Sequence, residues 1–308
     1  MSELILHHYA MSPFAEKIRL ILGYKKLAWQ SVTIPSIMPK PDLVALTGGY
    51  RRTPVLQIGA DIYCDTALIC DVLEQRQPTP SLHPQQSKGA RIVAQWADSA
   101  LFQAAMAYNF SAKGAAHVFQ GQAPEVAKAF AEDRARMRGG ASRMHSGDAA
   151  SAYRSYLRRI AAMVDEQAYV LGEQPSLADF CCYHPLWFTR RQVAPLAAIL
   201  DTAASIVPWM DRMEAYGHGA MALSDSSAAI AIAAQATPAA IDQSVFQDDH
   251  GIALGSRVSI TAESFGLEST EGELLAATRT RYSLRRSDPR AGTVHVHFPR
   301  VGFQLRAV

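Results

Sequence analysis

The sequence predicts a three-part protein, with an α/β segment first, an all-helical segment next and a small all-β segment last. Residues 1–76 alternate runs of β-forming residues with helical apolar periodicity, in the order βαβ, an irregular link and ββα. The periodic stretches between residues 87 and 236 are all helical. After residue 251 the pattern changes to short strands separated by turn residues, which is typical of a small barrel or curled sheet. We therefore expect domains at residues 1–80, 86–236 and 250–308.

Composition and charge indicate a folded protein without a strongly charged partner. The chain has 308 residues, of which 49% are hydrophobic, so it can bury a sizeable core. Lys and Arg number 30 against 28 Asp and Glu, a net charge of +2, which argues against a dedicated nucleic-acid binder. No basic stretch precedes a long apolar run at the start, and the most apolar stretch is too short to span a bilayer. The four cysteines lack zinc or redox spacing, so we expect a cytoplasmic protein with no membrane partner and no metal.

The elements of the first segment follow from local signals. Ser12 is a good N-cap residue and Pro13 suits the first position of a helix, so a helix is expected to begin there. Runs of β-forming residues predict four strands, two of which are joined by a tight turn. The expected strands are residues 4–9, 28–34, 55–58 and 61–64, and the helices are 13–23 and a second one that begins at Asp65 or Thr66.

The later segments contain one strong helix signal and several strand signals. Ser176 and Asp179 form a capping box in front of an apolar run, and Pro185 should end or kink the helix that follows. Helical periodicity also covers residues 87–119, 149–167 and 207–216, while residues 257–261, 272–284 and 293–298 have strand character.

Several motifs, taken in order, resemble the glutathione transferase superfamily. Residues 9–19, Tyr-Ala-Met-Ser-Pro-Phe-Ala-Glu-Lys-Ile-Arg, resemble the turn that holds the family's catalytic Ser or Cys. Residues 52–56, Arg-Thr-Pro-Val-Leu, resemble its cis-proline segment, and residues 65–69, Asp-Thr-Ala-Leu-Ile, its acid-plus-hydroxyl helix start. The capping box at residues 176–179 matches one in its helical domain. The resemblance implies a thioredoxin-like domain, an all-helical glutathione-transferase domain and a homodimer, and the last 60 or so residues lie outside the family's usual extent.

Ser12 is the candidate catalytic residue. A free thiol has a pKa near ~8.5, so a transferase must favour the thiolate at neutral pH. A hydroxyl at a helix N-terminus can donate a hydrogen bond to the sulfur, and the free N–H groups and helix dipole add positive potential there. The alternative is that Ser12 is only an N-cap. The turn holds no cysteine, which excludes a mixed disulfide there, so the resemblance implies a Ser-type transferase with omega-like and zeta-like features.

The resemblance also implies a set of glutathione-binding residues. Thr53 would pair with the backbone of the tripeptide beside a cis peptide bond at Pro54. Asp65 would face the ammonium of the γ-glutamyl end and Thr66 its carboxylate, while Lys40 would reach the C-terminal carboxylate. The alternatives are that Asp65 is a helix cap and that Lys40 is a solvated surface lysine.

The expected function is conjugation or transfer of the glutathione thiolate, with glutathione as co-substrate, to an apolar electrophile. One alternative is a binding protein that keeps the fold without the chemistry. Another is an interaction or nucleic-acid module that acts through the β segment. We expect no nucleic-acid partner because acidic residues balance the arginines of this segment. These arginines are Arg279, Arg281, Arg285, Arg286 and Arg290.

His295 and His297 alternate with apolar residues, which indicates a solvated strand face rather than a metal site.

Overall fold

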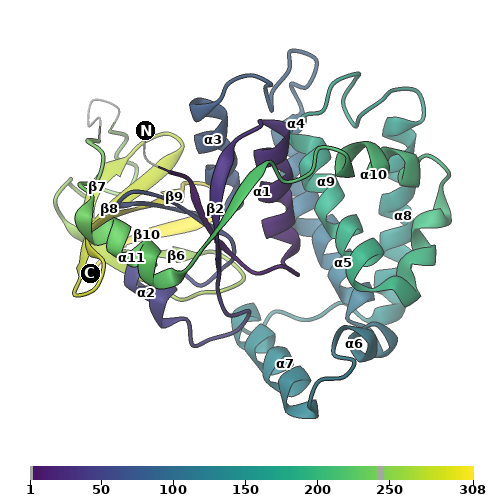
Figure 1. The fold of residues 1–308 in the computed structure, drawn as a ribbon, viewed down its shortest axis with the longest axis horizontal. Helices are drawn as coiled ribbons and strands as arrows, with labels where there is room; N and C mark the ends of the chain where they lie inside the picture. Colours follow the sequence, from purple (N-terminus) through teal and green to yellow (C-terminus); the bar gives the residue numbers. More distant parts are fainter. Residues whose placement is uncertain (1–2, 242–245) are drawn as a thin grey trace.

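The computed structural model describes residues 3–241 and 246–308, so residues 242–245 of the expected linker lie outside the described part. Within that part, ten strands form one sheet in the order β10-β6-β7-β8-β9-β4-β3-β1-β2-β5. The sheet lies on one side of the molecule and a group of helices on the other (Figure 1). No helix among the described residues is long and apolar enough to cross a membrane.

The first segment confirms the expected thioredoxin-like order. In β1, alternate side chains point to opposite faces of the sheet. Leu6, together with Leu4 just before the strand, therefore belongs to the buried cluster that contains side chains of α1 and α3, whereas Ile5 belongs to the cluster that contains side chains of α2. The elements are β1 (Ile5–His8), α1 (Pro13–Tyr24), β2 (Ala28–Thr33), α2 (Pro41–Thr47), β3 (Val55–Ile58), β4 (Asp61–Cys64) and α3 (Thr66–Arg76).

The helical segment confirms the capping box. The backbone N–H of Ser176 donates to Oδ2 of Asp179 at 2.9 Å, and Asp179 also accepts from Trp209 Nε1 at 3.1 Å. Pro185 lies inside its helix, and a π-helical turn follows directly. The helices are α4 (Ala90–Trp96), α5 (Phe102–Asn109), α6 (Ala112–Val118), α7 (Pro124–Arg138), α8 (Ser146–Val164), α9 (Leu177–Trp187) and α10 (Ile206–Glu214), with π-helical turns at Ala97–Leu101 and Phe188–Gln192 and a 3-10 segment at Ala194–Thr202.

The end of the segment expected to be helical contains a strand. Residues Ala220–Ser224 form β5, which pairs in parallel with β2, and α11 (Ser226–Gln235) then packs against the sheet beside α2. The expectation of an all-helical segment was wrong at these five residues. The reason is that β5 takes its hydrogen-bonding partner from residues nearly 200 positions earlier, which local periodicity does not reveal.

The C-terminal strands confirm the expected all-β segment and continue the N-terminal sheet. β9 pairs in parallel with β4, from Asp61 opposite His295 to Tyr63 opposite His297. Both parts contribute to one buried cluster, which includes Ile62. The small barrel we expected is thus part of an open sheet, and the domain boundaries stay a prediction. The strands are β6 (Arg257–Ala262), β7 (Thr270–Ala277), β8 (Arg281–Asp288), β9 (Gly292–Pro299) and β10 (Phe303–Ala307).

Candidate functional site

Three turns meet at one end of the N-terminal sheet. His7 of β1 pairs with Val55 of β3, and Val55 in turn pairs with Cys64 of β4. This register places the loop after β1, the turn before β3 and the turn after β4 at the same end of these three strands. The turns hold Ser12, the Thr53–Pro54 pair and the Asp65–Thr66 pair, so strand register alone gathers most of the residues predicted for a glutathione site.

Ser12 lies at the N-terminus of α1, as expected. Its Oγ accepts a hydrogen bond from the backbone N–H of Ala15 at 3.2 Å, and the residue is 2% exposed. The cap uses an oxygen lone pair, so the hydroxyl proton stays free to be donated to a second acceptor. Ser12 is therefore an N-cap, and the cap does not exclude a hydrogen bond to a bound thiolate.

The Thr53–Pro54 peptide bond is cis, as the resemblance implied. Lys40 lies against this turn, where its Nζ donates to the carbonyl oxygen of Arg51 and to Oγ1 of Thr53, both at 3.1 Å. Lys40 is 3% exposed, which rules out a solvated surface lysine. Burial, together with the positive charges of Arg134 and Arg51, lowers the pKa of Lys40 to about 8.

The Asp65–Thr66 pair opens α3. Asp65 Oδ1 accepts from the backbone N–H of Ala67 at 2.9 Å, so Asp65 is the N-cap of this helix. Its backbone has φ +73°, in the left-handed region that non-glycine residues seldom adopt. Oδ2 of Asp65 lies 3.5 Å from a guanidinium nitrogen of Arg52, and Thr66 is buried beside it. Asp65 thus combines a cap with an ion pair, and its role toward an ammonium stays a prediction.

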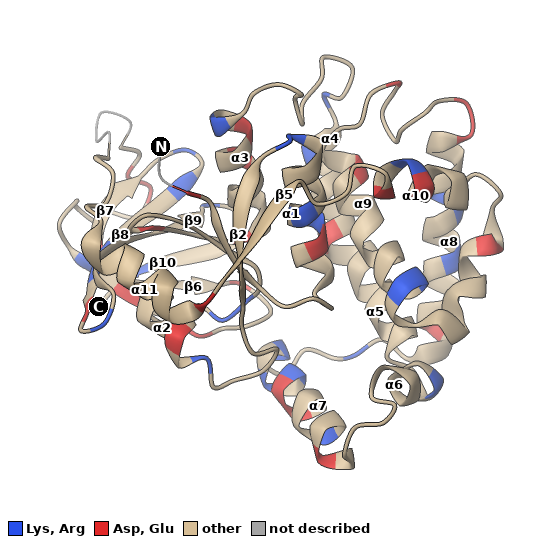
Figure 2. Cartoon of the chain, in the orientation of Figure 1, with Lys and Arg blue, Asp and Glu red and all other residues tan. Residues whose placement is uncertain are grey.

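Helix α7 supplies two residues beside the proline turn that the sequence did not indicate. Asp133 is fully buried and forms ion pairs with Arg51 and with Arg134, the latter at 2.7 Å. Arg134 also donates to Tyr9 Oη at 3.3 Å and to the carbonyl oxygen of Ser36 at 3.0 Å. Both acidic and basic residues lie along α7 (Figure 2). Arg51, Ser36 and Tyr9 lie 82 to 125 residues from the α7 residues that they contact, so no local pattern could have found these contacts.

The loop between β6 and β7 also borders this region. Glu268 accepts from Arg51 Nη1 at 2.7 Å, and the carbonyl oxygen of Phe265 accepts from Arg52 Nε at 2.5 Å. The N–H of Gly266 donates to the carbonyl oxygen of Met137 at 2.7 Å. Burial opposes the charge of Arg51, but its hydrogen bonds to Glu268 and Asp133 raise its pKa above the usual value. All three parts of the chain therefore meet around the two arginines that precede Thr53.

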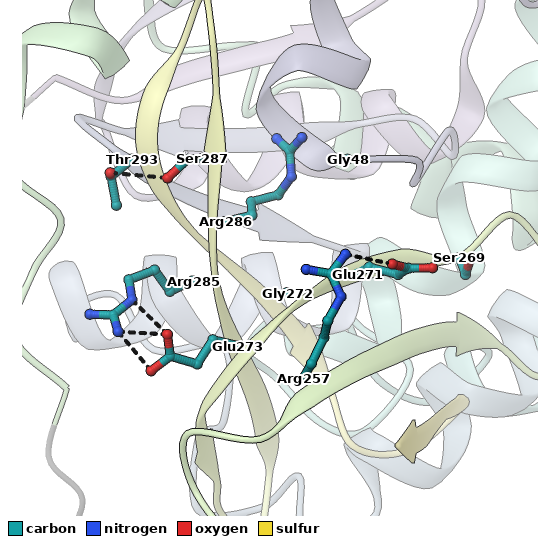
Figure 3. Close-up of a pocket in the computed structure, with 10 residues that line it drawn as sticks. All are labelled: Gly48, Arg257, Ser269, Glu271, Gly272, Glu273, Arg285, Arg286, Ser287 and Thr293. Carbon is teal, nitrogen blue, oxygen red and sulfur yellow. Dashed lines mark hydrogen bonds and ion pairs between the residues drawn. The ribbon is translucent and has the colours of Figure 1, made fainter. Parts of the chain in front are cut away.

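A cavity of about 880 Å³ lies elsewhere, on the C-terminal strands (Figure 3). Its arginines have partners within the protein: Arg257 pairs with Glu271 at 2.8 Å and Arg285 with Glu273 at 2.6 Å. Arg286 Nη1 donates to the carbonyl oxygen of Ala45 in α2 at 2.5 Å. These pairs agree with the expectation that the arginine-rich strands are balanced by acids, and they leave little charge for an anionic ligand.

His297 corrects the expectation of a solvated strand face. It is 2% exposed, its Nε2 lies 3.0 Å from Asp61 Oδ1, and its Nδ1 lies 2.8 Å from Ser283 Oγ. Burial lowers the pKa of His297, so the neutral form is favoured. The expectation of a solvated face was wrong because the pairing of β4 with β9 brings Tyr63, whose ring stacks on that of His297, and Asp61 against this histidine. Within residues 3–241 and 246–308, no group of three or more His, Cys, Asp or Glu side chains is arranged to hold a metal ion.

The family model for the glutathione S-transferase N-terminal domain matches residues 6–81. The crystal structure of a GST-like protein from Pseudomonas syringae is 43% identical, with 100% of both chains covered and a TM-score of 0.76. Glutathione S-transferase III in its apo form is 17% identical, covering 70% of this chain and 92% of the other, with a TM-score of 0.50. The β-etherase LigF from Sphingobium sp. strain SYK-6 is 18% identical, covering 70% and 96%, with the same TM-score of 0.50. These last two show the fold alone.

A curated relative matches a shorter stretch. Pyrimidodiazepine synthase of Drosophila melanogaster is 29% identical over 87 residues, which is 26% of this chain and 35% of the relative. The match thus spans about a third of the length of that relative.

Proposed function

This chain belongs to the family of glutathione S-transferase-like proteins, and from that premise we propose that it binds glutathione as a co-substrate and transfers its thiolate to an apolar electrophile. The observation that carries the proposal is that three turns meet at one end of strands β1, β3 and β4, with Ser12 at the N-terminus of α1. We further propose that the protein acts in the cytoplasm as a homodimer, as the family resemblance implies.

The tripeptide would lie along the proline turn. Thr53 would pair with its backbone, and Asp65 and Thr66 would hold the γ-glutamyl end at the N-terminus of α3. Lys40 would neutralise the carboxylate at the other end. The contact of Lys40 Nζ with Thr53 Oγ1, at 3.1 Å, supports this arrangement because it places the cation beside the residue that would hold the tripeptide backbone.

Ser12 would stabilise the sulfur in its ionised form. The free hydroxyl proton would be donated to the thiolate, and the N-terminus of α1 would add positive potential. The thiolate then attacks the electrophile, so a sulfur–carbon bond forms and the leaving group departs with its electron pair. Phe14, two residues after Ser12, and Phe102 are partly exposed, and the centroids of their rings lie 4.6 Å apart. These two rings offer an apolar surface for the electrophile.

A second candidate is a glutathione-binding protein without turnover. The observation that favours it is the 2% exposure of Ser12, whose Oγ already caps α1. Binding of glutathione with no conjugation of any aryl halide or epoxide tested would favour this candidate over the first.

Calorimetric and thermal-shift titrations with glutathione test the binding site. We expect glutathione to raise the melting temperature, since a ligand at a hundredfold excess over its Kd stabilises a protein by about 2.7 kcal/mol. Asp65→Asn keeps an N-cap acceptor and removes only the charge, so it should bind at least tenfold more weakly, because a hydrogen bond to a charged group contributes about 1.5–3 kcal/mol. Asp71→Ala removes a carboxylate from the same helix, where it pairs with Arg91, and should bind as the wild type does. Equal affinities for all three proteins would contradict the assignment.

A further inference from the structure

Helix α7 carries a fully buried carboxylate although most of its residues are exposed. Asp133 is 0% exposed, and it shares its burial in this helix with Met137. Figure 1 shows α7 at the lower edge of the molecule. A buried carboxylate lowers stability unless ion pairs and hydrogen bonds compensate for its lost hydration. The partners of Asp133 therefore indicate its role.

One oxygen of Asp133 contacts two loops of the N-terminal segment. Oδ1 forms the ion pair with Arg51 and accepts from the backbone N–H of Met38 at 3.4 Å. Arg51 lies two residues before Thr53 in the proline turn. Met38 lies two residues before Lys40, whose Nζ donates to the carbonyl oxygen of Arg51 at 3.1 Å. The loop that carries Lys40 and the turn that carries Thr53 therefore meet at a single carboxylate oxygen.

The other oxygen of Asp133 leads to a third loop. Oδ2 lies 2.7 Å from Nη1 of Arg134. Arg134 in turn donates to Tyr9 Oη at 3.3 Å and to the carbonyl oxygen of Ser36 at 3.0 Å. Tyr9 lies three residues before Ser12, in the loop that precedes α1. Asp133 thus contacts two of the loops that hold the proposed site directly, and it contacts the third through Arg134.

The chain on either side of α7 does not fix the position of the helix. Gly121 and Gly140 flank it with φ +77° and +91°, and an added Cβ at either glycine would have no atom of the described residues within 4 Å. The neighbouring residues are exposed. On its inner face, Met137 accepts a hydrogen bond from the N–H of Gly266 at 2.7 Å. The position of α7 therefore depends on the contacts of this face, which include the ion pairs of Asp133.

We propose that Asp133 is a positioning residue of the glutathione site, which fixes the loop of Lys40 relative to the turn of Thr53. This inference rests on the proposed function, because Lys40 and Thr53 are proposed to bind the tripeptide. A buried apolar pair would hold α7 at least as firmly, whereas directed ion pairs favour one arrangement of the loops. Loops that are ordered before the ligand arrives reduce the entropy lost on binding.

The same residues set the electrostatic environment of Lys40. The charged groups that face it are Arg51 of the proline turn and Asp133 and Arg134 of α7. Burial and the two arginines lower the pKa of Lys40, whereas Asp133 raises it. Glu268 pairs with the other side of Arg51 at 2.7 Å. Removal of the charge of Asp133 should therefore lower the pKa of Lys40 further, and removal of the charge of Arg134 should raise it.

Hydrogen exchange on the free protein tests the positioning of the loops. Asp133→Asn keeps an acceptor oxygen and removes the charge, so the amides of residues 36–40 and 50–53 should exchange about threefold faster or more. Glu132→Gln is the matched control, because it removes the neighbouring exposed carboxylate of the same helix, and it should exchange as the wild type does. Unchanged exchange in Asp133→Asn would overturn the proposal.

Arg134→Gln keeps the proposal testable if Asp133→Asn does not fold. This variant removes the bonds to Tyr9 and Ser36 and leaves the ion pair of Asp133 with Arg51 in place. Exchange should again be faster at residues 36–40. Exchange at the wild-type rate there would contradict the proposal.

Calorimetry with S-methylglutathione tests the consequence for binding. At pH 6 Lys40 is charged in every variant, and Asp133→Asn should bind about fivefold more weakly, because ordering one long side chain on binding costs affinity of this size. The pH at which affinity declines should move down in Asp133→Asn and up in Arg134→Gln. A purely structural loss would weaken binding without opposite shifts, so shifts in the same direction would contradict the proposal.

The two readouts separate this proposal from the proposed function. A wild type that binds no S-methylglutathione would refute the glutathione site, while hydrogen exchange would still decide whether Asp133 fixes the two loops. A wild type that binds, together with an Asp133→Asn variant of unchanged exchange and affinity, would overturn the positioning role and leave the glutathione site in place.

Discussion

Nζ of Lys17 lies 2.6 Å from Oδ2 of Asp98, and no part of the Lys17 side chain is exposed. The other oxygen of Asp98 lies 2.9 Å from His184 Nε2 on α9. Burial opposes the charge of Asp98, but Lys17 and His184 lower its pKa below the usual value. Because Lys17 follows Ser12 by five residues, this ion pair ties the start of α1 to the helical segment.

Asp98→Ala should destabilise the protein by about 3–5 kcal/mol, because the substitution leaves Lys17 as a buried charge without its counter-ion. Urea unfolding measures the loss, and Asp148→Ala, which removes an exposed carboxylate of α8, should cost less than ~0.5 kcal/mol. The double variant Lys17→Met with Asp98→Leu should recover most of the loss. A single-variant loss below about 1 kcal/mol would show that the pair carries little of the stability.

Ser12→Ala should lower turnover at neutral pH far more than it lowers glutathione affinity. Besides capping α1 through Ala15, the hydroxyl would contact only the sulfur of the tripeptide. Its removal should therefore raise the pKa of the bound thiol, and each unit corresponds to about 1.4 kcal/mol. The rate deficit against an aryl halide should therefore shrink as pH rises. Ser12→Thr keeps both the hydroxyl and the cap and serves as the control. Overlapping pH–rate profiles for wild type and Ser12→Ala would show that Ser12 acts only as the N-cap of α1.

Lys40 should make ligand binding depend on pH near 8. Its pKa in the folded protein is lowered to about 8, so below that pH the side chain is a cation and above it the charge is lost. The affinity for S-methylglutathione, which has no thiol to titrate, should be full below pH 8 and fall as pH rises through it. In Lys40→Arg, whose guanidinium stays charged, calorimetry should find a smaller decline over the same range. Identical pH dependence in the two proteins would show that Lys40 does not bind the C-terminal carboxylate of the ligand.

A chain that ends at residue 250 should be poorly soluble or melt well below the wild type. The deletion removes β6 to β10, uncovers the edge of β4 and removes the histidine partner of the buried Asp61. It also opens the cluster that Ile62 shares with Val296. Thermal unfolding measures the melting temperature of the shortened chain for comparison with that of the full protein. A soluble product with the melting temperature of the full protein would mean that the C-terminal strands form an independent unit, as their sequence pattern suggests.

The sequence predicted those features whose interactions are local. Ser12 caps α1 through Ala15, and Asp65 caps α3 through Ala67, so each signal and its partner lie within three residues. The Ser176 capping box has the same short range. Turn and cap chemistry of this kind depends on side chains next to the helix start and survives in any tertiary context. For this reason the element order and the positions of Ser12 and Asp65 could be predicted without a structure.

The tertiary structure alone decided how these elements pair and what surrounds the site. Local periodicity left open whether Lys40 is a surface residue or a site residue. Its burial against Thr53 excludes the surface, and its role toward a carboxylate stays a prediction. The ion pair of Arg51 with Asp133 joins residues 82 apart, and the bond of Asp61 with His297 joins residues 236 apart. Strand pairing and buried ion pairs depend on which distant segment supplies the partner, and a strand reveals its own pattern of faces without revealing its neighbour. That is why the sequence could show three segments, while only the folded chain joined them in one sheet.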